Sequence, residues 1–437
     1  MNELKLALAP ASPAAVPAAG RTAGGAPRLL AAVRSPLVWT ALLVAVAGAC
    51  LRVWPWAGWV GKIGVDEAYY SRYLTQLVQS GLGGYPDIVD NYKLLQANLV
   101  GSILPPTRFL YIFCAYLWHG AFGGESLECF RAVSRLFGVL TLLLAGLFAR
   151  RLLADRRLAL GAFALMAASP LQIHMAQHAL ADGFFEFWAL GTLWALWECL
   201  NQPGHKGWLA AYGLGLAALV TTKENAFFVW VAVVALLVLN RWVRFGQVNR
   251  ALVVLTFVGP LVGVAVLVNL SGGLTSLIDV YRLGVPKNLA LPYAIKTGDG
   301  PWYRYLLDLL TMSPLVLLLA VGTAWQLRVA PDGRRDDRPL IFALGFIAAS
   351  YVLMCNVKYG MNLRYATMWD LPLRVLAVTQ VGWLAARWPA ERRAWVLTLA
   401  VAGLCLFDVN QYYELGVQYP LYELAPTNLL HALSILK

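Results

Sequence analysis

The chain has few charged residues, and its connecting segments are short. Charged side chains make up 13% of the 437 residues, whereas 59% are hydrophobic, and the mean hydropathy is +0.62. This balance excludes an ordinary soluble globular domain and is typical of an all-α polytopic membrane protein. The connecting segments are also too short to hold a Rossmann domain for a sugar nucleotide.

Several compact chemical motifs are missing. The sequence contains no glycine-rich phosphate loop, GxSxG elbow or Walker motif, so nothing supports nucleotide hydrolysis or serine-hydrolase chemistry. It has no CxxC pair, which argues against a cysteine zinc site or a regular disulfide framework; its six cysteines are Cys50, Cys114, Cys129, Cys199, Cys355 and Cys405. The net charge of +12 is explained by basic cytoplasmic loops, so we expect no nucleic-acid partner.

Arginine-rich segments determine the predicted topology. Residues 1–35 are rich in Ala, Pro and Gly, and we expect a disordered cytoplasmic tail rather than a signal peptide. Placing every arginine-rich loop in the cytoplasm leads to about eleven transmembrane helices. Their predicted ranges are 36–54, 130–149, 158–173, 184–200, 208–220, 226–240, 251–270, 303–325, 340–355, 367–386 and 395–408.

The predicted membrane domain covers residues 36–410, with outer loops at about 55–129 and 271–302 and an outer tail at 411–437. Within the first loop, Pro105-Pro106 opens an apolar run, Thr107 to Trp118, that is shorter than the roughly 20 residues needed for crossing. We expect this run to be a helix lying in the outer interface.

An acidic pair, Asp66 and Glu67, follows the first predicted span. Apolar residues then recur at helical spacing as far as Val78, and Gly81 follows as a stop signal. Asp66 is either the N-cap of this helix or a functional carboxylate. Its predicted place at the outer membrane edge favours function, because charges there are costly and mark functional sites.

A second polar segment places His174, His178, Asp182 and Glu186 at four-residue steps. If the segment is one helix, the four side chains share a face. His174, His178 and Asp182 are then candidate ligands of a divalent cation. The alternative is a hydrogen-bonded polar seam, with Asp182 capping the next span.

Two further segments place cations at the predicted outer edge. Lys223 either contacts a phosphate or forms a local ion pair with Glu224, and Arg364 can bind a phosphate with two donors. Asp370 and Arg374 stand four residues apart, which favours a local ion pair.

The order of these motifs resembles that of the GT-C membrane glycosyltransferases, and in particular the branch of protein O-mannosyltransferases and lipid A aminoarabinose transferases. The resemblance extends from about Pro36 to Ala386. It rests on Asp66-Glu-Ala-Tyr-Tyr, Pro105-Pro106, Phe122-Gly123, Arg131, Arg150-Arg151, Asp182, Lys223 and Arg364-Tyr365.

The resemblance implies a GT-C fold and the transfer of a sugar, with inversion, from a polyprenyl phosphate to an acceptor hydroxyl or phosphate. The acceptor would be a lipid, glycan or protein at the outer face of a bacterial inner membrane. Asp66 would be the base or the carboxylate that orients the acceptor, Glu67 its support and Asp182 the second acid. The substrate-binding candidates are Tyr69, Arg72, Lys93, His178, Lys223, Arg364 and Tyr365.

The sequence departs from the aminoarabinose branch at Leu104, where that branch often has a basic residue before Pro-Pro. Contact with the donor phosphate then falls to Lys93, Arg108 or Arg72, or to a divalent cation. A lipid-linked sugar flippase or small-solute transporter is the main alternative. It is disfavoured because the chain shows no internal repeat and its polar groups gather at the outer edge.

Overall fold

The computed structural model describes residues 35–54, 64–329, 336–419, 421 and 424–435. Within these ranges every regular element is a helix, which confirms the prediction of an all-α chain. The predicted cytoplasmic tail lies outside the described residues except for Ser35. The chain divides into two units, Met1–Thr40 and Ala41–Lys437, and the packing that follows is that of the second.

The helices follow one another with short connections. In chain order they are α2 (Pro36–Val53), α3 (Val65–Ser80), η1 (Leu82–Gly84), α4 (Tyr85–Asn98), α5 (Phe109–Phe122), α6 (Ser126–Leu152), α7 (Arg156–Ala167), α8 (Pro170–Gln177), α9 (Ala181–Asn201), α10 (Lys206–Thr222), α11 (Ala226–Val243), α12 (Arg250–Leu270), α13 (Leu274–Asn288), α14 (Pro292–Gly298), α15 (Arg304–Met312), α16 (Pro314–Val329), α17 (Arg338–Met354), η2 (Leu363–Trp369), α18 (Asp370–Ala385), α19 (Ala390–Tyr412), η3 (Tyr413–Gln418) and α20 (Ala425–Ala432).

Several of these helices are long and apolar enough to cross a membrane. By length and composition, α2, α6, α11, α12 and the segment Ala390–Gln418 qualify alone, and the bent pair α7–α8 qualifies as a further broken span. A helix lies at each of the eleven predicted ranges, but the number that cross stays a prediction. The chain is a multi-pass membrane protein.

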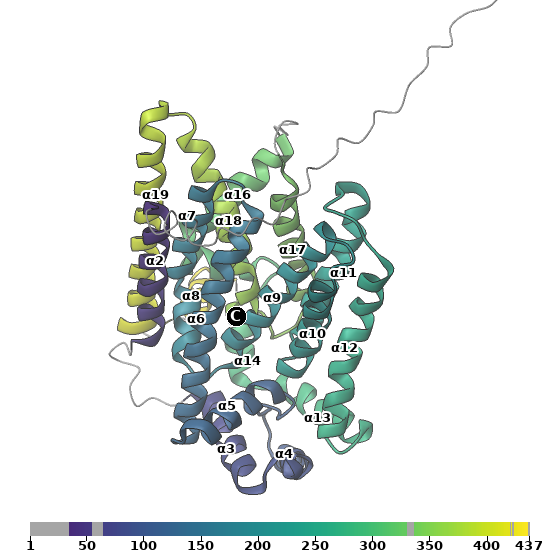
Figure 1. The fold of residues 1–437 in the computed structure, drawn as a ribbon. Helices are drawn as coiled ribbons and strands as arrows, with labels where there is room; N and C mark the ends of the chain where they lie inside the picture. Colours follow the sequence, from purple (N-terminus) through teal and green to yellow (C-terminus); the bar gives the residue numbers. More distant parts are fainter. Residues whose placement is uncertain (1–34, 55–63, 330–335, 420, 422–423, 436–437) are drawn as a thin grey trace, which may run out of the picture. The chain divides into compact units, whose positions relative to one another are not determined.

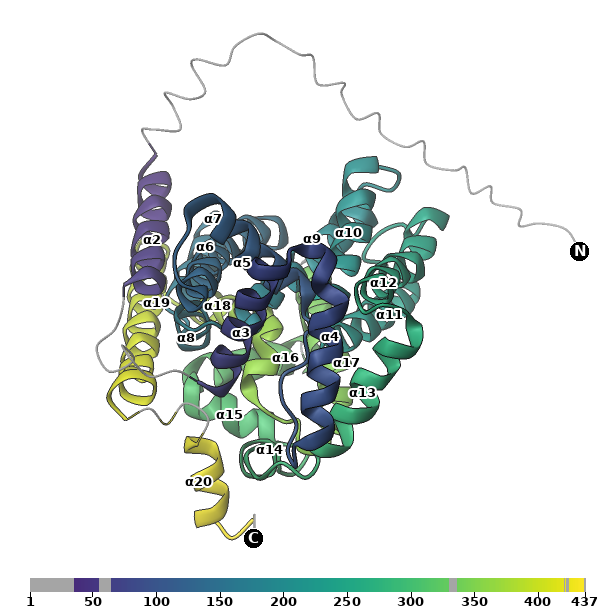
Figure 2. The ribbon, with the colours of Figure 1, turned by 90° about the horizontal axis from the view of Figure 1, so that it is seen from below.

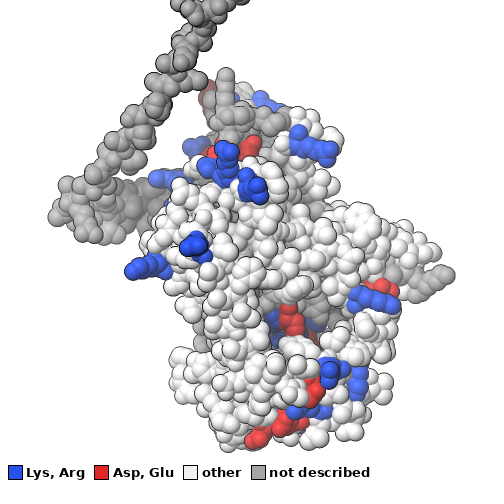
Figure 3. Space-filling model, turned by 90° about the vertical axis from the view of Figure 1, so that its right-hand side faces the viewer, with Lys and Arg blue, Asp and Glu red and all other residues white. Residues whose placement is uncertain are grey.

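Charged side chains gather at two ends of the helix bundle. Arginine-rich loops, such as α6–α7 and α18–α19, lie at one end (Figures 1 and 3). The short helices α3, α4 and α5 lie across the opposite end, together with α13 (Figure 2). We call this second end the site end. The predicted interfacial helix after Pro105-Pro106 is α5, which has 14 residues.

Close helix packing at α10 forms one side of the site. Helix α10 lies between α9 and α12. Gly259 and Gly263 of α12 have four-residue spacing and face α10, and a Cβ atom at either position would lie within 3.0 Å of an α10 backbone oxygen. Small residues at this spacing allow two helices to approach closely in a membrane.

The predicted span 158–173 is broken, which corrects the expectation of one continuous helix. Helices α7 and α8 meet at an angle of 47°, because Ser169 caps α8 and Pro170 occupies its first turn. The break leaves carbonyl groups at the end of α7 without helical partners. Arg52 of α2 donates to two of them, those of Met166 and Ala167, at 2.9 Å.

The predicted span 303–325 is also two helices, α15 and α16, rather than one. Ser313 leaves the helical conformation, with φ −145° and ψ 63°, directly before Pro314. A proline disfavours helical geometry in the residue that precedes it, which accounts for the break.

A buried ion triad joins α18 to α19. Arg374 donates to Asp370 at 2.8 Å and to Asp408 at 2.7 Å, and Asp370 also accepts from Ser169 at 2.5 Å. The predicted pair between Asp370 and Arg374 is therefore confirmed and has a third member. Two carboxylates share one guanidinium in the interior, so removal of the cation leaves both uncompensated.

We expect Arg374→Ala to lower the free energy of unfolding by about 3–5 kcal/mol, because breaking a buried ion pair leaves an isolated charge. Thermal unfolding in detergent measures the change. The exposed Arg392 provides the control, and Arg392→Ala should unfold like wild type. Adding Asp370→Asn and Asp408→Asn to Arg374→Met should recover most of the loss. An unchanged melting temperature for Arg374→Ala would contradict this account.

Candidate active site

Glu67 anchors the start of α3. The N-cap of this helix is Gly64, not Asp66. Glu67 accepts hydrogen bonds from the backbone N–H groups of Gly64 and Ala179, both at 2.8 Å. Its carboxylate also lies 3.6 Å from His178 Nδ1 and 3.8 Å from Arg131 Nε. Burial raises the pKa of Glu67, but hydrogen bonds from His178, Gly64 and Ala179 outweigh it and lower the pKa to about 2.

Asp66 lies beside Glu67 in the first turn of α3 and faces a cation. Arg364 Nη1 donates to Asp66 Oδ2 at 3.0 Å, and 27% of the Asp66 side chain is exposed. The side chain of Asp66 is thus oriented by the guanidinium and still reachable from outside. The fold thus brings together Asp66 and Arg364, two predicted site residues that are 298 positions apart in the chain.

Lys223 pairs with Asp182 and not with its neighbour Glu224. The Lys223 ammonium donates to the Asp182 carboxylate, and both side chains are almost fully buried. Lys223 Nζ also lies 4.2 Å from the centre of the Tyr365 ring, and Arg364 Cζ lies 5.2 Å from it. Tyr365 therefore stands between the two cations.

A third cation at the site end is Arg108, on the loop before α5. Arg108 donates to Glu224 Oε2 through Nε at 3.2 Å and through Nη2 at 3.1 Å. Its Nη1 donates to the Tyr70 hydroxyl at 3.2 Å. Burial raises the pKa of Glu224, but Arg108 and Lys223 hold it below its ordinary value, so the carboxylate stays ionised near neutral pH.

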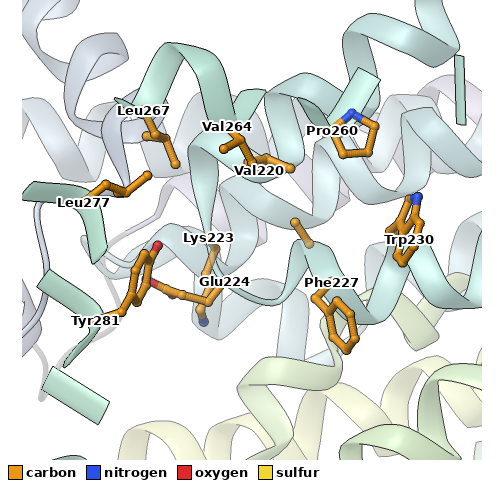
Figure 4. Close-up of a pocket in the computed structure, with 11 residues that line it drawn as sticks. Val220, Lys223, Glu224, Phe227, Trp230, Pro260, Val264, Leu267, Leu277 and Tyr281 are labelled. Carbon is orange, nitrogen blue, oxygen red and sulfur yellow. The ribbon is translucent and has the colours of Figure 1, made fainter. Parts of the chain in front are cut away.

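An apolar cavity ends at Lys223 and Glu224 (Figure 4). Its volume is about 360 Å³, and α10, α11, α12 and α13 supply its walls. The close-up shows Glu224 and Tyr281 facing each other at one end, with Phe227 and Trp230 toward the other. The lining residues are Val220, Lys223, Glu224, Ala226, Phe227, Trp230, Pro260, Val264, Leu267, Leu277 and Tyr281.

The cavity combines a charged end with apolar walls. Phe227 is 56% exposed and Val264 is 39% exposed, although both are large apolar residues of membrane-length helices. Such surfaces are expected to face lipid. Acidic and basic side chains are visible in a hollow on this face of the molecule (Figure 3). The arrangement suits an amphiphile with an anionic head and an apolar chain.

The predicted metal-ligand set is wrong for the residues named. Helix α8 ends at Gln177, and His178 is extended, with φ −105° and ψ 151°, so the shared helical face does not form. The rings of His174 and His178 are 4.5 Å apart, but Asp182 is engaged with Lys223. No group of three metal-ligating side chains occurs among the described residues. The residues present do not fit a metal centre here.

Other predicted substrate-binding residues lie in different settings. Lys93 contacts Asp90 at 2.7 Å and Ser276 at 2.9 Å, which ties α4 to α13. Arg72 is exposed on α3, and Tyr69 stacks loosely on Tyr73 with ring centres 6.5 Å apart. Of the three cations proposed to replace the family's basic residue at Leu104, Arg108 is the one that contacts the cavity residue Glu224.

The candidate list omitted Tyr70, Glu224 and Arg131. Tyr70 has the helical spacing of an ordinary core residue, and Glu224 follows Lys223 so closely that a local pair was the simpler interpretation. Arg131 lies 64 residues beyond Glu67 along the chain. No local sequence signal shows which partner each of these side chains meets.

The comparisons with known proteins agree with this fold. Residues 121–274 match the family model described as dolichyl-phosphate-mannose-protein mannosyltransferase. Over 93% of this chain and 74% of the other, the structure resembles ArnT from Cupriavidus metallidurans bound to undecaprenyl phosphate, with a TM-score of 0.51 and 16% identity. The chain has a GT-C fold.

A second structural neighbour is the Archaeoglobus fulgidus oligosaccharyltransferase in complex with zinc and sulfate. The TM-score is 0.53 at 17% identity, over 85% of this chain and 53% of that one. These two likenesses confirm the predicted fold.

Curated relatives match parts of the chain. A Pseudomonas fluorescens undecaprenyl phosphate-α-4-amino-4-deoxy-L-arabinose arabinosyl transferase is 31% identical over 252 residues, which are 53% of this chain and 44% of the relative. The corresponding Pseudomonas aeruginosa enzyme is 32% identical over 168 residues, 36% of this chain and 30% of the relative. The chain thus spans less than half the length of these relatives.

We expect Glu67→Gln to lower the free energy of unfolding by about 1–3 kcal/mol, because its amide has one acceptor oxygen and leaves one buried N–H group unpaired. Thermal unfolding measures this loss. Glu128→Gln serves as the control, since the side chain of Glu128 is 52% exposed and also contacts Arg131. Equal melting temperatures for the two variants would exclude the anchoring role.

Proposed function

We propose that the protein is a membrane glycosyltransferase that moves a sugar from a polyprenyl phosphate to an acceptor hydroxyl or phosphate. The observation that carries this proposal is a network that connects Asp66, Arg364 and Tyr365 with Lys223 and Asp182, and that meets an apolar cavity at Lys223. The two Pseudomonas relatives are named as undecaprenyl phosphate-α-4-amino-4-deoxy-L-arabinose arabinosyl transferases.

The proposed donor site uses the cavity for the lipid and its charged end for the phosphate. Lys223 lies at that end, and Arg108 reaches it through Glu224. Two cations in a setting with little water stabilise the charge that develops on a leaving phosphate. The apolar walls between α11, α12 and α13 would take the first isoprene units of the carrier.

The proposed chemistry is a single displacement. The acceptor oxygen forms a bond to the anomeric carbon of the sugar, while the bond from that carbon to the phosphate oxygen breaks and its electron pair stays on the phosphate. Asp66 takes the acceptor proton or orients the acceptor. Arg364 and Tyr365 connect Asp66 with Lys223, so the carboxylate and the phosphate site are held in one network.

The proposed orientation places the site end outside the cytoplasmic membrane. Arginine-rich loops lie at the opposite end, and such loops are typically cytoplasmic. A polyprenyl phosphate sugar would then be used at the periplasmic or extracellular face, where nucleotide sugars are not available.

A transporter of lipid-linked sugars is the second candidate. The observation in its favour is the broken span α7–α8, since interrupted helices are common in transporters. The break is occupied by Arg52 and Ser169, which accounts for it without a transported solute. Turnover of a polyprenyl phosphate sugar by the purified protein separates the two candidates.

We expect Asp66→Asn to reduce turnover by about 100-fold or more, since general acid–base catalysis contributes 10²–10⁴-fold. The assay supplies a panel of polyprenyl phosphate sugars and measures the release of free polyprenyl phosphate. Asp87→Asn, an exposed change on α4, should act like wild type. Equal turnover by Asp66→Asn and wild type would refute the catalytic assignment. Absence of turnover with every donor would favour the transporter.

We expect kcat/KM to fall as the pH rises through about 8. Burial lowers the pKa of Lys223 to about 8, although Asp182 opposes the shift. The protonated form, which holds the phosphate, is therefore present below this pH and is lost above it. An arginine keeps its charge at higher pH. In Lys223→Arg, the alkaline pH at which kcat/KM falls should therefore rise by at least one pH unit. Superimposable profiles for the two proteins would contradict the role of Lys223.

A further inference from the structure

The three site-end cations described above each have a carboxylate partner. Arg364 faces Asp66, Lys223 faces Asp182 and Arg108 faces Glu224. A set of ion pairs has little net charge to offer a phosphate. The proposed function requires a donor phosphate to bind one of these cations. The carboxylate that pairs with that cation then shares its positive charge with the phosphate.

Glu224 is the carboxylate most able to respond. Its side chain is 34% exposed and lines the cavity, whereas that of Asp182 is 3% exposed. Glu224 lies in the three-residue turn between α10 and α11. Asp66 is also partly exposed, but the proposed reaction uses it at the acceptor. Glu224 is therefore the acid that remains next to the phosphate without a chemical task.

The surroundings of Glu224 hold its negative charge in the cavity. Arg108 is the cation that contacts it, and Lys223 lies next to it in the chain. Tyr281 of α13 lies beside Glu224 in the cavity (Figure 4). Burial raises the pKa of Tyr281 and of Tyr92 of α4, and the negative charge of Glu224 adds to this effect on both phenols. An additional anion at this end of the cavity would meet a fixed like charge.

The proposed transfer reaction changes the charge of the lipid. The donor is a phosphodiester with one negative charge. After the bond between sugar and phosphate breaks, the product is a phosphomonoester whose second ionisation has a pKa near 6. The product therefore carries nearly one additional negative charge at neutral pH, while the donor does not.

We propose that Glu224 is a specificity-determining residue that weakens the binding of the polyprenyl phosphate product relative to the polyprenyl phosphate sugar. This inference rests on the proposed function. The Glu224 carboxylate partly neutralises the charge of Arg108 and repels the second negative charge of the phosphomonoester. Glu224 thereby promotes product release and limits product inhibition, and it does not take part in bond formation.

The test compares Glu224→Gln with wild type in direct binding of undecaprenyl phosphate to the purified protein in detergent. Glutamine keeps the shape of the side chain and an acceptor for Arg108, but it removes the charge. We expect the monoester to bind about tenfold more tightly, because removing a like charge at short range in a partly buried site changes the affinity by about this factor. The affinity for an undecaprenyl phosphate sugar should change less than the affinity for the monoester. Inhibition by the product should become stronger.

Two controls separate charge from structure. Glu224→Asp retains the charge and should keep the wild-type ratio of monoester to diester affinity, whereas Glu224→Ala should change that ratio in the same direction as Glu224→Gln. Asp87→Asn removes an exposed acid of α4 and should leave both affinities unchanged. If Glu224→Gln and Glu224→Ala change the ratio of affinities in the same direction, the change does not depend on a folding defect of one variant.

The outcomes are distinct. If wild type binds the monoester but Glu224→Gln binds it with equal or lower affinity, this inference is overturned and the proposed function stands. If wild type binds neither undecaprenyl phosphate nor any undecaprenyl phosphate sugar, the proposed function fails, and the role of Glu224 fails with it.

Discussion

The structure of the site end depends on pairing each buried charge with an opposite one. Lys223 and Asp182 are both nearly inaccessible, and either one alone would be prohibitively costly to bury. Their pairing fixes the turn after α10 against the first turn of α9. Because Tyr365 packs on Lys223 and its backbone carbonyl accepts from Asn225 at 3.3 Å, the same pair also places η2, and with it Arg364.

The break between α7 and α8 serves the same requirement. A continuous helix through Ser169 would use the carbonyl groups of Met166 and Ala167 in its own hydrogen bonds and leave Arg52 with the carbonyl of Gly48. The break at Ser169 instead supplies carbonyl acceptors to Arg52 and a hydroxyl donor to Asp370. The extended residue after α8 brings the N–H group of Ala179 to Glu67. The same break thus places a buried backbone N–H group where it can pair with a buried carboxylate.

The sequence predicted the helices and the acidic pair well, because apolar runs and arginine-rich loops are local signals. It predicted the local pair of Asp370 and Arg374 but not which cation meets which acid at the site end. Lys223 and Glu224 are neighbours in the chain, but Lys223 pairs with Asp182 and Glu224 pairs with Arg108. The face predicted to be shared by His174, His178 and Asp182 does not form for a similar reason. Four-residue spacing predicts a shared face only if the helix continues, and α8 ends before His178.

Asp66, Asp182 and Glu224 pair with Arg364, Lys223 and Arg108. These three carboxylates differ in their access to solvent, and this difference separates their roles. Asp182 is sealed by Lys223 and cannot exchange a proton readily with an incoming acceptor, so it serves the cation that it pairs with. Asp66 lies in the first turn of α3, where it is partly exposed and is held by Arg364. An incoming group can therefore reach Asp66 more easily than Asp182. The ion pairs that make the burial of these charges possible thus also determine which of the two carboxylates stays accessible.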